Sequence, residues 1–272
     1  MMAATPVTQH YARPGIAKRA LAALREANGS EAPVTPDALA PFDQFHGRGL
    51  VATGELLRLL DPQPGERILD IGCGIGGPAR WIAAKIGCHV TGVDLTPEFC
   101  EAADALNDAC GMADCVTIRN GSALDLPLPD AAFDRAYSQN VVMNIADKPR
   151  FYCEAFRVLR PGGVVALSNV CAGPAGPPHF PVPWAETPTT SFLATPEETR
   201  GDIAAAGFEI LSFRDTSEEL RDERLGQDGM PGLGLHIVMG ERFSLMRRNS
   251  ARSAAENRTR TVEILARKPA QG

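Results

Sequence analysis

The sequence lacks both long apolar runs and an excess of basic residues. None of its hydrophobic stretches approaches the length of a membrane span, and residues 1–10 (MMAATPVTQH) contain no apolar signal core. Its 27 Lys and Arg residues are outnumbered by 33 Asp and Glu residues, which gives a net charge of −6. Because a polyanion is bound by a basic surface, nucleic acid is not an expected partner. We therefore predict a cytoplasmic protein that neither spans a membrane nor binds nucleic acid.

The cysteines and histidines lack the spacing of a metal site. Seven cysteines form no CxxC pair, and five histidines form neither an HxH nor an HExxH ligand set. An odd number of scattered cysteines is typical of reduced, mostly buried thiols. We predict no metal site from these residues.

Short apolar stretches alternate with helical patterns through the middle of the chain. The predicted strands are 67–71, 89–94, 116–119, 133–138, 164–170, 207–213 and 260–266, and the predicted helices among them are 77–87, 97–110 and 148–159. Such alternation indicates βαβ units and a parallel sheet with right-handed crossovers. The expected fold is α/β, with a seven-stranded, mostly parallel sheet and helices on both faces.

Two further helices, at 14–28 and 49–60, are predicted before the first strand. Two segments fall outside the alternation: 171–194 is rich in Pro and Gly, and 218–258 reads as an irregular loop followed by a helical stretch. Both are expected to cap the edge of the sheet where open α/β folds bind ligands. We predict a single domain over 1–272, composed of an N-terminal helical segment (1–64), a ligand-binding core (65–170) and the two insertions.

A glycine loop, ILDIGCGIGG, follows the first predicted strand. Gly72, Gly74 and Gly77 satisfy the GxGxxG pattern, which by itself also permits a dinucleotide. Asp70 lies two residues before the first glycine, where a carboxylate would repel a pyrophosphate but suits a ligand that carries an ammonium group. Asp94 ends the second strand and is placed to accept hydrogen bonds from two ribose hydroxyls. Asp70 therefore favours a ligand with an amino group, whereas Asp94 supports a nucleotide site without choosing between the two kinds of ligand.

Four ordered segments resemble the motifs of class I S-adenosylmethionine (SAM)-dependent methyltransferases. LDIGCGIGGPARWIA resembles their motif I and VTGVDLTPEF their second motif. NGSALDLPLPDAAFDRAYSQ resembles their third region, and RVLRPGGVVALSN resembles the helix–PGG–strand segment that follows. The order and spacing agree over about residues 65–170. The resemblance implies a Rossmann-like SAM-binding core with SAM as cofactor.

The resemblance places the cofactor contacts at the ends of successive strands. The expected residues are Asp70, Gly72, Cys73, Gly74, Gly76, Asp94, Leu95, Ser122, Ala123 and Gln139. Relatives carry an acid that contacts the adenine amino group where this chain has Ser122, whose hydroxyl is a weaker acceptor.

Flanking segments resemble small-molecule methyltransferases, including the sarcosine/dimethylglycine, tocopherol and ubiquinone/menaquinone-biosynthesis enzymes. FDQFHGRGL and Thr53 resemble their FHxGG…T segment, which covers the methionine end of SAM, although Arg48 replaces a glycine. FPVPWA resembles a segment that helps to enclose the methyl acceptor. Phe45 and Trp184 are therefore candidate substrate residues. The alternative for Trp184 is that it only packs the insertion onto the domain.

The candidate catalytic residues are His46, Asn140 and Asn144. Relatives often place a histidine near the last two positions, and for His46 the alternative is positioning or packing. Gln139 and both asparagines are neutral and hence weak ligands for a divalent ion, so we expect no metal, and Asp147 is expected to cap the next helix. The predicted reaction is an in-line methyl transfer to N, O or C of a small molecule.

Two other classes of function remain open. A nicotinamide-dependent oxidoreductase could use the same glycine loop, but Asp70 and the ordered motifs count against it. A protein that binds SAM without catalysis is permitted by the missing histidines. Neither the methyl acceptor nor the oligomeric state follows from the sequence, whereas the absence of a basic stripe disfavours an RNA substrate.

Overall fold

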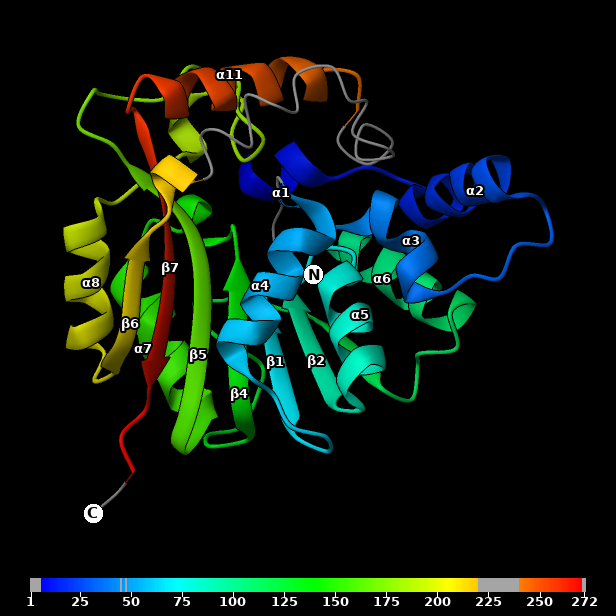
Figure 1. The fold of residues 1–272 in the computed structure, drawn as a ribbon, viewed down its shortest axis with the longest axis horizontal. Coiled ribbons are helices and arrows are strands. Elements are labelled where there is room, and N and C mark those ends of the chain that lie inside the picture. Colours follow the sequence, from blue (N-terminus) through cyan, green and yellow to red (C-terminus); the bar gives the residue numbers. More distant parts are fainter. Residues whose placement is uncertain (1–5, 45, 47, 220–239, 271–272) are drawn as a thin grey trace.

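Seven strands form one mixed sheet through the centre of the molecule (Figure 1). The computed structural model describes residues 6–44, 46, 48–219 and 240–270. The strands are β1 (Arg67–Ile71), β2 (His89–Asp94), β3 (Val116–Asn120), β4 (Phe133–Gln139), β5 (Leu159–Ala172), β6 (Glu209–Asp215) and β7 (Thr259–Arg267). Their order is β3-β2-β1-β4-β5-β7-β6, and β7 is antiparallel to both of its neighbours. The predicted fold class, a seven-stranded and mostly parallel sheet, is confirmed.

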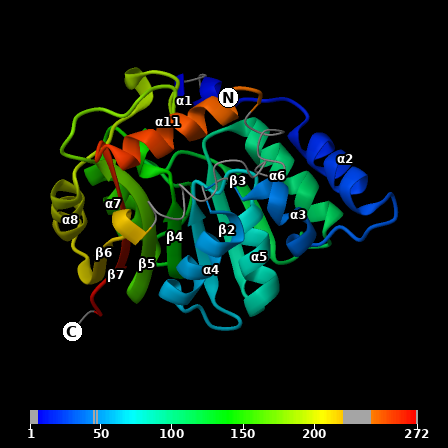
Figure 2. The same cartoon turned by 45° about the horizontal axis from the view of Figure 1, so that its top comes forward.

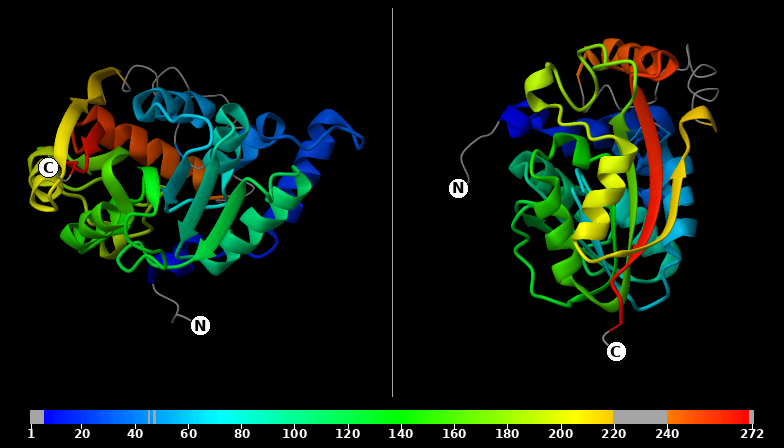
Figure 3. Two further views of the ribbon diagram at one scale, coloured as in Figure 1. Left: turned by 90° about the horizontal axis from the view of Figure 1, so that it is seen from below. Right: turned by 90° about the vertical axis from the view of Figure 1, so that its left-hand side faces the viewer.

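Helices cover both faces of this sheet (Figure 3). The helices are α1 (Pro6–Tyr11), α2 (Ile16–Asn28), α3 (Pro36–Asp43), α4 (Gly49–Leu60), α5 (Gly77–Ile86), α6 (Pro97–Ala109), α7 (Lys148–Val158), α8 (Pro196–Ala205) and α11 (Phe243–Ala255). Proline stands at the first or second position of α3 and α5 to α8, where its missing N–H costs no hydrogen bond. The Asp147 side chain accepts a hydrogen bond from Arg150 N at 3.1 Å, which confirms it as the cap of α7.

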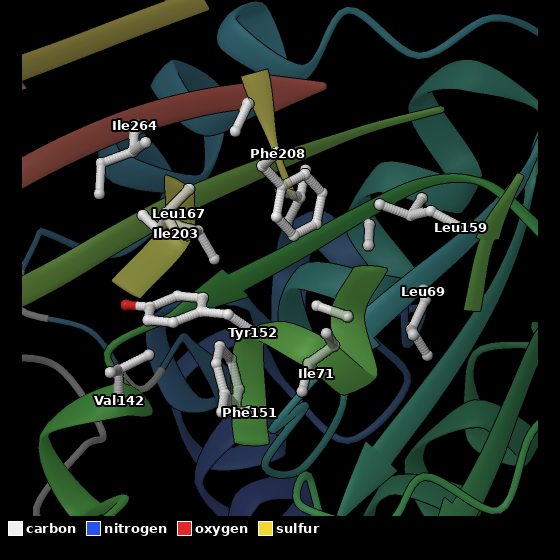
Figure 4. Packing of buried hydrophobic residues seen from close by; sticks show 14 of the residues in the cluster. Leu69, Ile71, Val142, Phe151, Tyr152, Leu159, Leu167, Ile203, Phe208 and Ile264 are labelled. Carbon is white, nitrogen blue, oxygen red and sulfur yellow. The ribbon is translucent and has the colours of Figure 1, made fainter. Parts of the chain in front are cut away.

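Three apolar clusters hold the layers together. On one face, α4 and α5 pack against β1, β2 and β4; on the other, α7 and α8 pack against the central strands (Figure 4). The third cluster joins α2, α3 and α6 around Ile75 of the glycine loop. Both faces of β1 are therefore buried, which explains its continuous apolar run.

The strand β5 is longer than the predicted 164–170. It begins at Leu159, directly after α7, and Pro161-Gly162-Gly163 lies within it instead of between the helix and the strand. Gly162 has a φ of 80°, and the register with β4 shifts between Phe133 and Arg135. The glycines thus provide a bulge at the start of the strand. Three short helices, α1, α3 and α8, also form where no helix was predicted.

The helix α11 crosses above the carboxyl ends of the central strands, close to α1 (Figure 2). It supplies the helical stretch that was predicted within 218–258, while residues 220–239 of that insertion lie outside the described residues. No helix in the described part of the chain has both the length and the hydrophobicity of a membrane span. The single-domain assignment stays a prediction.

A buried arginine joins α3 to the glycine loop. Arg80 of α5 is 0% exposed and donates from Nη2 to Asp43 Oδ2 at 3.0 Å and to the Ile75 carbonyl at 2.7 Å. Its Nη1 donates to Asn107 Oδ1 at 3.0 Å. Gly77 lies beside this pair, and a Cβ there would overlap the backbone carbonyl of Asp43. Only glycine therefore lets α3 approach the start of α5 this closely.

Replacing Gly77 with alanine should lower the free energy of unfolding by about 1–3 kcal/mol, because the new methyl group must displace backbone atoms. Urea denaturation measures the change. Gly201→Ala in α8 is the matched control, since a Cβ there meets nothing within 4 Å. This control should be neutral or should stabilise by up to about 1 kcal/mol. Equal stability of Gly77→Ala and the parent protein would show that α3 does not need this approach.

Candidate active site

The carboxyl ends of β1 to β4 meet at one edge of the sheet. The strand order reverses between β1 and β4, since β2 and β3 follow on one side of β1 and β4 begins the other half. Open α/β sheets bind their ligands outside such a switch point. All ten candidate cofactor residues lie at this edge, on the last residues of the four strands or in the turns that follow them.

The glycine loop is fastened to the end of β2. Gly72 N and Cys73 N donate to the Val93 carbonyl at 2.8 and 3.1 Å, and Gly74 N donates to Asp94 Oδ2 at 2.9 Å. Gly72 and Gly76 have φ values of 80° and 75°, which favour glycine. The loop and Asp94 therefore form one rigid unit before α5 begins.

Asp94 retains hydrogen-bonding capacity for a ligand. Its Oδ2 accepts from Gly74 N at 2.9 Å and its Oδ1 from Thr96 N at 2.8 Å. A carboxylate has about four acceptor positions, so capacity is left on the carboxylate. Burial raises the pKa of Asp94 to about 6, although the two backbone amides and the Thr96 side chain act in the opposite direction.

Asp70 is the second acid at this edge and is 3% exposed. Its Oδ2 accepts a hydrogen bond from the Tyr137 hydroxyl at 2.8 Å. Burial raises the pKa of Asp70 to about 7, the Tyr137 bond lowers it, and the nearby Asp94 raises it further. Two buried carboxyls side by side create a local demand for a cation. Sequence reasoning missed Tyr137, because its contact depends on the pairing of Asp70 with Tyr137 between β1 and β4.

The ends of β2 and β3 form the other side of the candidate cofactor site. Asn120 Nδ2 donates to the carbonyls of Asp94 and Leu95 at 3.0 and 3.1 Å, which holds the two strand ends together. Ser122 Oγ accepts from Leu124 N at 3.1 Å, so its own hydroxyl hydrogen remains to be donated. Ala123 lies next to it, half-buried against the core.

Three segments distant in sequence meet at Asn144, just beyond β4. Its Oδ1 accepts from the Tyr11 hydroxyl at 3.0 Å, and its Nδ2 donates to the carbonyls of Trp184 and Thr190 at 2.8 and 2.9 Å. Both amide hydrogens are therefore already used within the protein. Asn140, by contrast, has a φ of 55° and a half-buried side chain. Sequence reasoning missed Tyr11, which lies in a helix of six residues.

The structure describes only one of the two candidate substrate residues, Trp184. Trp184 is 3% exposed, donates from Nε1 to Ser191 Oγ at 2.9 Å and packs against Met143 and Val182. These contacts agree with the alternative that it packs the insertion onto the domain. Phe45 lies outside the described residues.

His46 is 5% exposed and lies between α3 and α4. Its Nε2 is 2.9 Å from Thr53 Oγ1, and its Nδ1 is buried with no hydrogen-bond partner among the described residues. Burial and the charge of Arg48 lower the pKa of His46 to about 4, so the imidazole is neutral at physiological pH.

Gln139 Oε1 at the end of β4 is also buried without a described partner. No group of three or more His, Cys, Asp and Glu side chains in the described ranges is arranged to hold a metal ion.

Residues 69–167 match the family described as "Methyltransferase domain". The core of the chain is therefore similar to methyltransferase domains. The chain is 35% identical over 142 residues to a phosphoethanolamine N-methyltransferase of Triticum aestivum, and 32% identical over 161 residues to a glycine/sarcosine/dimethylglycine N-methyltransferase of Actinopolyspora halophila. These matches cover 50% and 59% of this chain, but only 28% of each relative. The predicted resemblance to small-molecule methyltransferases is confirmed.

Solved structures share the fold of this core and its flanking segments. The [4+2]-cyclase SpnF superposes with a TM-score of 0.64 and 26% identity, covering 81% of this chain and 82% of that protein. A geranyl diphosphate C-methyltransferase of Streptomyces coelicolor A3(2), solved with Mg²⁺, geranyl-S-thiolodiphosphate and S-adenosyl-L-homocysteine, superposes with a TM-score of 0.71 and 18% identity. That match covers 98% of this chain and 100% of the other. One fold therefore carries different reactions among these neighbours.

The raised pKa of Asp70 predicts a pH-dependent cost to stability. The value rises from 3.8 to about 7 on folding, so the folded state holds this proton more tightly. Its contribution to stability is complete below pH 3.8 and is lost as the pH rises to about 7. Asp70→Asn cannot ionise, and the ligand-free variant should therefore melt at a higher temperature than the parent protein at pH 8.

Melting curves between pH 4 and 8 test this expectation. The advantage of Asp70→Asn should grow across that interval. Asp134→Asn is the control, because Asp134 accepts from Arg67 N at 2.6 Å and pairs with Arg160 at the opposite edge of the sheet, so its loss should destabilise. Parallel curves for Asp70→Asn and the parent protein would contradict the account.

Proposed function

We propose that this protein is a SAM-dependent methyltransferase that acts on a small molecule. The observation that carries the proposal is the pairing of Asp94, bonded to Gly74 N at 2.9 Å, with the buried Asp70 at the β1/β4 switch point. A buried acidic pair suits a cationic amino acid–nucleoside and opposes a pyrophosphate. We also propose that the protein is cytoplasmic, with a small-molecule acceptor and no nucleic-acid partner.

The residues at this edge fit SAM in their hydrogen-bonding chemistry. Asp94 has acceptor capacity for ribose hydroxyls, and Asp70 and Gln139 Oε1 offer acceptors for an ammonium group. Ser122 has a hydroxyl hydrogen to donate to a ring nitrogen, with Leu95 and Ala123 beside it. The family cofactor supplies a methyl group activated by an adjacent sulfonium.

On the acceptor side, we propose that Asn144 is a positioning residue. Both hydrogens of its amide are donated to protein carbonyls, so it fixes α1 and the 171–194 insertion over the site instead of binding the acceptor. Asn140 and His46 remain the candidates for contact with the reacting atoms. Methyl transfer by in-line displacement depends mainly on holding the nucleophile close to the methyl group, and therefore needs little acid–base assistance.

The acceptor entrance that we propose lies between α1 and the two insertions. A surface cavity of about 440 Å³ there is lined by His10 and Arg13, by residues 186, 187, 189 and 190, and by Arg242 and Met246 at the start of α11. Arg242 forms an ion pair with Glu186, which links one insertion to the other. Segments outside the sheet thus surround the proposed entrance, and they would determine which small molecule enters.

A reaction other than methyl transfer is the second candidate, because the [4+2]-cyclase has the same fold at 26% identity. A nicotinamide-dependent reaction is disfavoured by Asp70, whose carboxylate would face a pyrophosphate. The assay must therefore follow the methyl group itself, and not only the consumption of the substrate.

Cofactor binding is the first test. S-adenosylhomocysteine should raise the melting temperature and NADH should not, because a ligand that binds only the folded state stabilises it. Asp94→Ala should weaken the calorimetric affinity by about 2–3 kcal/mol through the loss of charge-assisted hydrogen bonds. Asp134→Ala is the control and should leave the affinity unchanged. A thermal shift with NADH alone would refute the proposal.

The second test is incubation of methyl-labelled SAM with a panel of amine, hydroxyl and carbon nucleophile metabolites, followed by mass spectrometry. Label should appear in a small-molecule product, and the rate should be the same in EDTA. Gln139, Asn140 and Asn144 are neutral amides, which bind divalent ions weakly without a carboxylate. Activity lost in EDTA and restored by Mg²⁺ would contradict the metal-independent mechanism.

A further inference from the structure

A chain of buried hydrogen bonds runs from Arg80 to His46. Arg80 Nη2 donates to Asp43 Oδ2 at 3.0 Å, and Gln44 Nε2 donates to Asp43 Oδ1 at 3.2 Å. The Thr53 hydroxyl donates to Gln44 Oε1 at 2.6 Å and lies 2.9 Å from His46 Nε2. All five side chains belong to residues that are buried.

The direction of each bond in this chain is set by Arg80. Its guanidinium is permanently charged and donates to Asp43 Oδ2, which favours the carboxylate form of Asp43 although burial raises the pKa of this carboxyl. A carboxylate can only accept. Gln44 must therefore turn its NH₂ toward Asp43 and its carbonyl oxygen toward Thr53. The single hydroxyl hydrogen of Thr53 is then used on Gln44, so at His46 the hydroxyl oxygen can only accept.

The tautomer of His46 follows from this order. Nε2 must carry the hydrogen in order to donate to Thr53, and a neutral imidazole has only one N–H hydrogen. Nδ1 is consequently a bare lone pair, and it is buried with no partner among the described residues. A buried acceptor without a partner is costly, which indicates that a ligand satisfies it.

Topology places this lone pair near the active edge. The helix α4 ends just before β1 begins, so its first turn lies toward the carboxyl ends of the strands. Thr53 precedes Leu56 by nearly one turn, and Leu56 packs in the cluster that contains Tyr137 of β4. His46 bonds Thr53 and therefore lies on the same face of the sheet as Tyr137, the partner of Asp70.

We propose that Arg80, Asp43, Gln44 and Thr53 are positioning residues that hold His46 in the Nε2–H tautomer, so that Nδ1 accepts a hydrogen bond from the methyl acceptor. His46 then accepts and does not donate at that point. The arrangement selects nucleophiles that carry a hydrogen, such as an amine or a hydroxyl, over carbonyl or ether oxygens. This substrate class rests on the proposed function, whereas the tautomer does not.

Nitrogen-15 NMR of histidine-labelled, ligand-free protein tests the tautomer directly. A His46→Gln sample identifies the His46 signals. The parent protein and Thr53→Ser, which keeps the hydroxyl, should show a protonated Nε2 and a bare Nδ1. In Gln44→Met the Thr53 hydroxyl is free to donate to Nε2, so an Nδ1–H population should appear although Gln44 does not touch His46. A protonated Nδ1 in the parent protein, or an unchanged tautomer in Gln44→Met, would overturn the proposal.

Thr53→Val provides a second break in the chain, should Gln44→Met not fold, and it should also populate both tautomers. In the methyl-transfer assay, Gln44→Met should lower kcat severalfold and leave the affinity for S-adenosylhomocysteine unchanged. A loss of that affinity would instead place the cofactor at Nδ1 and overturn the assignment to the acceptor. Absence of any methyl transfer would contradict the proposed function but would leave the NMR result standing.

Discussion

The buried charge of Arg80 is the constraint on which the active site depends. An isolated guanidinium in the interior is strongly unfavourable, so the surrounding structure must supply its partners. These partners come from four places: Asp43 at the end of α3, the Ile75 carbonyl in the glycine loop, and Ala103 and Asn107 in α6. The Arg80 side chain thereby fixes the glycine loop between α3 and α6. The carboxylate of Asp43 also begins the hydrogen-bond chain that reaches His46.

The candidate cofactor edge has the opposite character, since its acids lack a buried cation of this kind. Asp70 is bonded by a neutral hydroxyl and Asp94 by backbone amides, so desolvation raises the pKa of both. Keeping the two carboxyls together at the switch point therefore lowers the stability of the folded protein. A cationic ligand would relieve that cost on binding, and the relief would contribute to its affinity. The raised pKa values thus describe an edge organised for a positively charged group.

Local sequence patterns predict much of the core, but they do not predict the contacts between residues that are far apart in the sequence. The bounds of β1 and β2 follow from short apolar runs between glycine and proline signals, and these strands occur as predicted. The start of β5 could not be predicted from the sequence, because the bulge there depends on pairing with β4. Asp70 and Asp94 were selected from their places in the loop motif, whereas Tyr137 and the Arg80–Asp43 pair join residues far apart in sequence. Such pairs require knowledge of strand order and helix packing that one sequence does not contain.

The cofactor half and the acceptor half of the proposed site are held in place in different ways, which explains why the identity of the methyl acceptor does not follow from the sequence. The cofactor half consists of strand ends, where the sheet fixes each residue by register. The proposed acceptor half consists of α1, the 171–194 insertion and α11. Asn144 bonds α1 and the insertion to the end of β4, and the ion pair of Arg242 with Glu186 links the insertion to α11. Strand register does not set the positions of these covering segments, because they are mostly helices and loops outside the sheet. The N-methyltransferases, the C-methyltransferase and the cyclase among the proteins similar to this chain illustrate that the reaction can vary while the fold is kept.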